Sequence, residues 1–145
     1  MEIEIRKILG DKPTRVESVG PDTSVHDAVA LMNERNIGSV LVLEAERTVG
    51  IFTERDVLTR VVAPGRDPAA TQVREVMTTK LLAIAPSTTV HEAMAIMTER
   101  RCRHLPVMVE GRAVGMISIG DLTRWVVRDQ QHTIDDLTDY IHHTS

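Results

Sequence analysis

The sequence predicts a mixed α/β (α+β) fold in which two copies of one strand, helix, strand, strand, helix unit pack as a pair. Three observations support this. Residues 21–58 recur at 86–123 without an insertion, always at the same offset, since 86 − 21 = 121 − 56 = 65. Each copy combines helical and strand-like apolar patterns, and each ends in a Gly, hydroxyl, Asp motif. Two repeats indicate a packed pair rather than a solenoid, so we expect function at their junction.

A short apolar run, at 16–19 and 81–85, lies ahead of each copy and predicts a strand. A helix follows, because Val25, Ala28 and Met32 fit the spacing of one helical face and the second copy repeats it. Ser24 with Asp27, and Thr89 with Glu92, have capping-box spacing at the helix starts.

Two further strands are predicted in each copy, over 40–43 and 48–52 and over 105–109 and 113–117. The second hairpin carries a Glu-Gly turn, whereas the first has Glu-Ala-Glu-Arg, so we expect a looser connection in the first copy. Second helices are predicted over 54–62 and from 119 to about 128.

These elements predict two repeat units, 10–64 and 75–129, followed by a C-terminal helical extension, 130–145. The stretch 64–68, Pro-Gly-Arg-Asp-Pro, predicts a linker or tight crossover. Ile134, Leu137 and Ile141 predict an amphipathic helix that caps the pair or meets another subunit. A half of some 60 residues is marginal alone, so we expect one shared core.

The composition excludes several function classes. A formal charge of −4 and 2% aromatic residues argue against nucleic acid as a partner. No apolar stretch approaches the length of a membrane span, and charged residues interrupt the stretch 1–10, which therefore lacks the apolar core of a secretory signal. The single cysteine, Cys102, fits a reducing compartment, and we expect a cytoplasmic protein.

The repeated motif reads GIFTERD at 50–56 and GMISIGD at 115–121. A hydroxyl followed three residues later by an acid is itself a capping box and could do nothing more than start a helix. The same geometry suits a ligand. The free amides at a helix start favour binding of a phosphate, with the hydroxyl of Thr53 or Ser118 as an added donor. An ionised Asp56 or Asp121 can accept hydrogen bonds from the two hydroxyls of a ribose. Recurrence in both copies favours the ligand.

With these motifs, the helix opening Pro-x-Thr-x-Val-His-(Asp/Glu)-Ala and the strand that begins at His104, the chain resembles a tandem pair of cystathionine β-synthase (CBS) domains over about 16–128. The resemblance implies two small sheets, each packed on two helices, related by a pseudo-twofold axis. It also implies clefts for adenosine-containing ligands, namely AMP, ADP, ATP, NAD or S-adenosylmethionine, and commonly a homodimer.

On this chain, the resemblance implies that Asp56 and Asp121 bind the ribose hydroxyls. It also implies that Thr53 and Ser118 face the phosphate. The adenine would lie against edge-strand residues and an opposite wall, comprising Ile37, Gly38, Ser39, Val40, Leu105 and Pro106 with Ser18, Val19, Ala83 and Ile84.

The two copies differ where phosphate would bind. Arg55 precedes Asp56, but its counterpart is Gly120; conversely, Arg103 and His104 stand where the first copy has Gly38 and Ser39. Because arginine donors match phosphate oxygens, we expect Arg55 to hold phosphate in the first cleft, and Arg103 or His104 to do so in the second.

The expected function is a non-catalytic regulatory module that binds an adenine nucleotide, AMP first, and signals to its own oligomer or to an unidentified regulated protein. The alternative is an oligomeric scaffold with vestigial clefts. No metal site and no catalytic residues are predicted, because no metal-ligand or nucleophile-base spacing is present.

Overall fold

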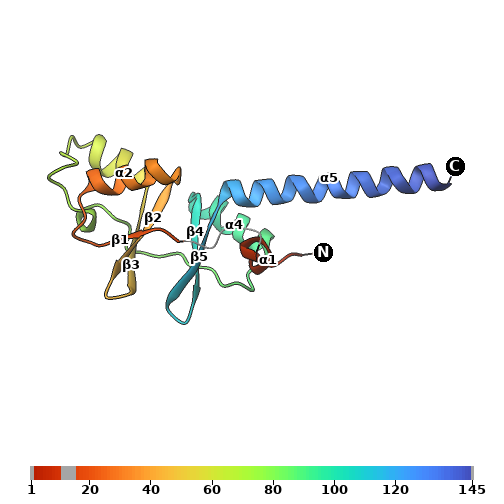
Figure 1. Cartoon of the computed structure of the whole chain (residues 1–145), viewed down its shortest axis with the longest axis horizontal. Helices are drawn as coiled ribbons and strands as arrows, with labels where there is room; N and C mark the ends of the chain where they lie inside the picture. The colour runs from red at the N-terminus through yellow and green to blue at the C-terminus, as the bar shows by residue number, and fades with distance from the viewer. Residues whose placement is uncertain (1, 11–15, 145) are drawn as a thin grey trace.

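A computed structural model describes residues 2–10 and 16–144 of the chain. Its first repeat has a three-stranded sheet of order β1-β2-β3, formed by β1 (Ser18–Val19), β2 (Ser39–Glu44) and β3 (Arg47–Thr53). β1 pairs parallel to β2, and β2 pairs antiparallel to β3. Helix α2 (Val25–Arg35) connects β1 to β2 (Figure 1). After β3 the chain forms α3 (Glu54–Asp56), which continues as a π-helix, η1 (Val57–Val62).

The second repeat contains the equivalent elements α4 (Val90–Arg100), β4 (His104–Val109), β5 (Arg112–Ser118) and α5 (Ile119–Thr144). Its predicted first strand is reduced to one parallel bridge, between Ile84 and Val107. Both hairpins carry a register irregularity at the same repeat position, after Val42 and after Val107. The mixed fold predicted from the duplication is therefore confirmed, with residues 11–15 and 145 of the predicted units outside the described part of the chain.

The start of each first helix has the hydroxyl half of the predicted capping box. The Ser24 hydroxyl accepts from the amide of Asp27, and the Thr89 hydroxyl accepts from the amide of Glu92. Both helices end at a residue in the left-handed conformation, Asn36 and its equivalent Arg101.

The looser first hairpin turn expected from the sequence is wrong. Glu44 pairs with Arg47, and Val109 pairs with Arg112, so each hairpin closes over two residues. Both central residues of each turn have positive φ, at 50° and 67° for Ala45 and Glu46 and at 50° and 79° for Glu110 and Gly111. This is the type I′ requirement. The twist of the paired strands selects this turn even where no glycine is present.

The single shared core expected from chain length is also wrong, because the described buried hydrophobic residues form two clusters. One contains Phe52 and Val25 of the first repeat; the other contains Leu105 and Leu122 of the second. Each cluster is completed by a segment from outside its own repeat. Ile5 and Ile8 belong to the second repeat's cluster, and Val73 and Val76 to the first repeat's cluster.

The two contributing segments cross between the repeats in equivalent ways. α1 (Ile5–Gly10) precedes the first repeat but lies beside β5 and α4 of the second (Figure 1). The segment around the 3-10 helix η2 (Val73–Glu75) precedes the second repeat but packs on the first. The amide of Ile5 donates to Thr88 at 2.7 Å, and the amide of Val73 donates to the equivalent Thr23 at 2.8 Å. This exchange fixes the repeats against one another.

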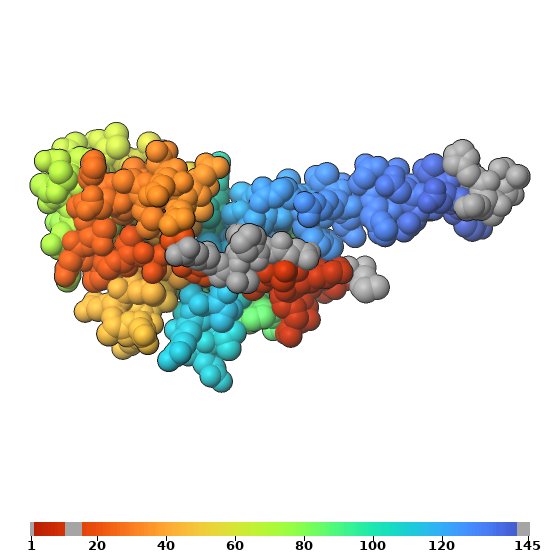
Figure 2. All heavy atoms as spheres, in the orientation of Figure 1, coloured from red at the N-terminus to blue at the C-terminus, as the bar shows by residue number. Residues whose placement is uncertain are grey.

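The C-terminal helix is longer than the sequence predicts. α5 runs without a break over 26 residues, so the second helix of the repeat and the predicted extension form one element. Its first turns pack on the second repeat through Leu122 and Trp125. The remainder projects from the body as a rod (Figures 1 and 2). No helix in the described residues is long and apolar enough to cross a membrane.

Candidate ligand clefts between the repeats

Both repeated motifs form complete capping boxes at a strand-to-helix junction. In the first, the amide of Thr53 donates to Asp56 Oδ2 at 3.0 Å, and the amide of Asp56 donates to Thr53 Oγ1 at 3.2 Å. In the second, the Ser118 amide donates to Asp121 Oδ2 at 2.8 Å, and the Asp121 amide donates to Ser118 Oγ at 3.1 Å. The capping interpretation is therefore confirmed for both motifs, and a ligand would have to use the acceptor capacity that remains.

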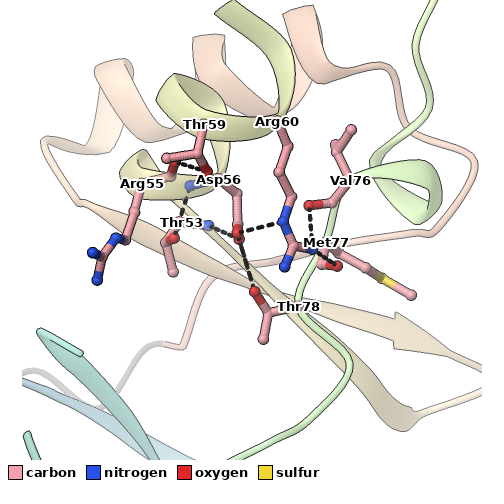
Figure 3. Close-up of polar contacts among 8 residues, drawn as sticks. All are labelled: Thr53, Arg55, Asp56, Thr59, Arg60, Val76, Met77 and Thr78. Carbon is pink, nitrogen blue, oxygen red and sulfur yellow. Dashed lines mark hydrogen bonds and ion pairs between the residues drawn. The ribbon is translucent and has the colours of Figure 1, made fainter. Parts of the chain in front are cut away.

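Further groups approach the Asp56 carboxylate, which is 5% exposed (Figure 3). The Thr78 hydroxyl lies 3.0 Å from Oδ1 and 3.3 Å from Oδ2. The Arg60 guanidinium lies 3.8 Å from Oδ1 and is held there by the carbonyl of Met77, at 2.8 Å. Arg55 points away from this cluster, as Figure 3 shows. The carboxylate is thus a buried anion supported by donors from the first repeat and from the crossing segment.

The equivalent Asp121 has different neighbours. Its Oδ1 atom accepts from Arg124 Nη2 at 2.7 Å. Gly10 stands at the repeat position that corresponds to Thr78, because Ile5 corresponds to Val73 in the crossing segments. A Cβ added at Gly120 would lie in ordinary van der Waals contact with Arg124, 3.5 Å from Nη1. The two carboxylates are therefore alike in capping and unlike in their cationic partners.

A large cavity of about 940 Å³ lies beside the first motif. Thr53, Arg55 and Asp56 line it from the first repeat, and Arg103, His104 and Pro106 line it from the second. Three further cations line this cavity and were not predicted as site residues: Lys80, Arg100 and Arg101. Five cationic and two acidic side chains, Glu54 and Asp56, line this cavity, so its formal charge is 5 − 2 = +3 with His104 neutral.

A smaller cavity of about 360 Å³ lies beside the second motif. Ser118 and Asp121 line it from the second repeat, and Ile37, Gly38 and Ser39 line it from the first. One cation, Arg124, and two acids, Glu17 and Asp121, give this lining a formal charge of 1 − 2 = −1. The cavities are thus related by the duplication but differ in size and in the sign of their charge.

Each cavity combines the motif of one repeat with the edge strand of the other, a crossing that the sequence could not show. Arg55 and Arg103 consequently line the same cavity, whereas they were expected to serve different clefts. His104 lines the cavity beside the second motif, as expected, and the large cavity as well. Hydrogen bonds across the boundary fix this arrangement, since Arg55 Nη1 donates to the Arg101 carbonyl at 2.7 Å. The run Arg100, Arg101, Arg103 was the signal in the sequence that could have located the cationic cavity.

Among the residues that the structure describes, His104 alone lines both cavities. Its ring covers Gly38 of the other repeat, where an added Cβ would lie 3.0 Å from the ring atoms Cε1 and Nε2. The glycine therefore permits the close approach of the two edge strands. A change at His104 would be felt on both sides of the repeat boundary.

The residues expected to contact adenine divide into two groups. Ile37, Gly38, Ser39 and Pro106 line a cavity. Val40, Leu105 and Ile84 are buried in the cores, and Val19 packs against one, while Ser18 and Ala83 are exposed. None of these last six lines either cavity. Leu81 and Leu82 line the large cavity in place of their neighbours Ala83 and Ile84.

Cys102 also lines the large cavity, next to the cationic run. Partial burial raises the pKa of its thiol above the ordinary value of 9.0. A nucleophilic cysteine needs a lowered pKa, so this environment is the opposite of an activated one. Among residues 2–10 and 16–144, no three His, Cys, Asp or Glu side chains are grouped so as to hold a metal ion.

Comparison with known proteins gives one consistent family. The model of the CBS domain matches residues 9–63 and again 73–128. The Arabidopsis thaliana mitochondrial protein CBSX3 is 39% identical over 83% of this chain, which spans 61% of that protein's length. A CBS-domain protein of Burkholderia ambifaria is 43% identical, with a TM-score of 0.85 over 88% of this chain and 96% of that one. A cyanobacterial CBS-CP12 protein described as hexameric is 27% identical, with a TM-score of 0.75 over 85% and 71%.

Proposed function

The chain belongs to the CBS-domain family, and we propose that it is a non-catalytic regulatory module that binds an adenine nucleotide in its large cavity. AMP is the first candidate, and ADP, ATP, NAD and S-adenosylmethionine belong to the same chemical class. The observation that carries the proposal is the lining of this cavity. A buried carboxylate, Asp56, and a +3 cationic lining stand at one junction of the repeats.

The sugar end of the ligand would bind at Asp56. A carboxylate has about four acceptor positions, and the Thr53 amide and Thr78 hydroxyl already approach this one. A ribose could bind beside the amide and replace Thr78, since vicinal hydroxyls supply two donors in one geometry. The capping box would survive, because the Thr53 amide bond uses only part of Oδ2.

The phosphate end would bind among the cations. Arg55 and Arg103 come from different repeats and line the same cavity, so a phosphate held by both would bridge the repeats. Charge-assisted bonds of this kind are stronger than neutral ones. The cationic lining would also attract the anion, despite the chain's net charge of −4.

The small cavity would be the weaker site for a nucleotide. Ser118 and Asp121 line the small cavity as Thr53 and Asp56 line the large one, but the lining of the small cavity carries a formal charge of −1. Arg124 is engaged by Asp121 at 2.7 Å. The difference in affinity between the large and the small cavity would therefore be smaller for uncharged adenosine than for AMP.

Regulation would come from differential affinity. A ligand that bridges two repeats shifts their relative orientation only as far as it binds one arrangement better. The output would pass to a partner protein or through self-association, for which the hexameric CBS-CP12 relative offers a precedent. We place the protein in the cytoplasm, a choice supported by its single cysteine.

Thermal unfolding with millimolar AMP, ADP, ATP, NAD, S-adenosylmethionine and adenosine tests the proposal. A ligand at 100 times its dissociation constant stabilises the folded state by about 2.7 kcal/mol, which for this length raises Tm by about 5–10 °C. An unchanged Tm with all six would favour the scaffold with vestigial clefts.

Alkylation of Cys102 locates the site. Bound nucleotide should slow the reaction of this thiol with iodoacetamide, because Cys102 lines the large cavity. Protection by AMP in the wild type, and its loss in Asp56→Ala, would support the assignment. Tm stabilisation without protection would place the ligand elsewhere.

A further inference from the structure

The outer half of α5 is exposed along its whole described length. Every described residue from Val127 to Ile141 is exposed, including Tyr140 and four large aliphatic side chains. Val127 is 57% exposed, Ile134 55%, Leu137 58% and Ile141 63%. Figure 2 shows this part of the helix as a rod outside the body. A single helix of such length is marginal in water unless its apolar face is covered.

The apolar residues of the rod follow a seven-residue repeat. Val127, Ile134 and Ile141 are seven apart, and Leu137 lies three positions after Ile134. These are the a and d positions of a heptad, with Gln130 at the other d position. A seven-residue period imposes a left-handed supercoil on a partner helix. β-branched residues at a with leucine at d favour two parallel strands.

The residues beside this seam are neutral. Gln131 and Thr138 occupy the e positions, and Thr133 and Tyr140 occupy the g positions. Within 127–141 the charged and imidazole-bearing residues all fall on the outer positions b, c and f; they are Arg128, Asp129, His132, Asp135, Asp136 and Asp139. A partner helix with charged residues at its own e and g positions would meet no opposite charge beside the seam. An identical copy would meet no like charge there.

We propose that residues 127–141 of α5 pair with the same residues of a second copy in a parallel, two-stranded coiled coil. The chain is then a dimer with one isologous seam, in which each residue meets its own equivalent near the twofold axis. The two bodies lie at the same end of the seam. This pairing goes beyond nucleotide binding and does not depend on it.

Molar mass in solution tests the pairing. Light scattering on the full chain should give two chains, 2 × 16.1 = 32.2 kDa, and Ile134→Asp should give one chain at the same concentration. His132→Asp is the matched control, because it places the same side chain on the outer face, and it should remain a dimer. Near-native circular dichroism of the body must accompany both variants. A monomeric wild type, a mass of three or more chains, or a dimeric Ile134→Asp would overturn the proposal.

Disulfide trapping tests the orientation. In a Cys102→Ser background, Val127→Cys and Ile141→Cys should each cross-link to its own equivalent, since a positions face one another across a parallel seam within reach of a disulfide. Asp139→Cys, at an outer position, should stay reduced under the same mild oxidation. Cross-linking only in a mixture of the Val127→Cys and Ile141→Cys chains would show an antiparallel pair and contradict the proposed arrangement. Cross-linking of Asp139→Cys alone would place the interface on the other face.

Discussion

The hydroxyl of Thr78 donates to Asp56 Oδ1 at 3.0 Å across 22 positions of the sequence. Thr78 belongs to the crossing segment, where its backbone bonds reciprocally with Ile51 of β3 at 2.9 Å. The carboxylate proposed to bind ribose is thereby tied to the chain that connects the repeats. A ligand that takes this acceptor would release the hydroxyl, so binding and the placement of the connecting segment are linked.

Replacing Thr78 by valine tests this link. Thr78→Val keeps the side-chain shape but removes the donor, so we expect the free energy of unfolding to fall by about 1–2 kcal/mol. We expect adenosine affinity to rise, because the ribose would no longer displace a hydroxyl. Urea unfolding and calorimetry measure the two effects, and Thr79→Val, at the exposed neighbouring position, should change neither. Parallel loss of stability and affinity would refute the competition.

Removing Arg55 or Arg103 should separate the phosphate from the nucleoside. Each of Arg55→Ala and Arg103→Ala should lower AMP affinity by about tenfold or more, the value of one charge-assisted bond, and change adenosine affinity less than twofold. Calorimetry with both ligands gives the comparison. Arg112→Ala, outside the large cavity, is the matched control. Equal losses for AMP and adenosine would reject the phosphate role.

Two equivalent glycines should report the packing of the crossing segments. A Cβ at Gly50 would lie 2.7 Å from Met77 Sδ and 3.0 Å from the Thr78 carbonyl oxygen, whereas the three atoms nearest to one at Gly115 all belong to the Leu9 side chain. We expect Gly50→Ala and Gly115→Ala to destabilise the fold by about 1–3 kcal/mol. Leu9→Ala should partly rescue Gly115→Ala, and Met77→Ala should rescue Gly50→Ala less, because a backbone oxygen stays in place. Urea unfolding of the single and double variants measures how far stability is restored at each site. Equal rescue at both sites would contradict this packing.

Acid should weaken the crossing segment through Glu75. The Gln72 amide, and then Arg66, lower the pKa of Glu75 below its ordinary 4.5. A carboxyl with a depressed folded pKa contributes stability above its unfolded value and loses it as pH falls through the folded value. Glu75→Gln should therefore be less stable than wild type near pH 7, and the two should converge as the pH falls below 4.5 and through the lowered pKa of the folded state. Thermal unfolding from pH 3 to 7 measures this, and a constant difference would exclude the carboxylate as its origin.

The repeat unit could be predicted because its signals are local. Helical spacing, hydroxyl caps and alternating strands lie within each copy, and the structure reproduces them. The crossing segments could not be read in this way, because their partners lie in the other repeat. Their shared pattern was nevertheless present, since Ile5, Ile8 and Leu9 correspond to Val73, Val76 and Met77 at an offset of 73 − 5 = 68. This exchange, rather than one common core, provides the apolar burial that each short repeat needs.

The motif residues could be predicted individually but not their grouping. Sequence spacing places Asp56 and Asp121 at equivalent helix starts and predicts the capping box that each forms. It does not say which edge strand faces each motif, because that depends on how the repeats pair. Arg55 and Arg103 therefore meet in one cavity, and the clefts differ in charge more than the motifs do.

Calorimetric titration of AMP into the full chain is the most direct measurement. We expect saturable binding that Asp56→Ala abolishes or weakens by more than tenfold, with the corresponding change at Asp121 having the smaller effect. The absence of measurable heat with AMP, together with an unchanged Tm for all six ligands, would contradict a nucleotide-binding role. Undiminished affinity in Asp56→Ala would contradict the placement of the site.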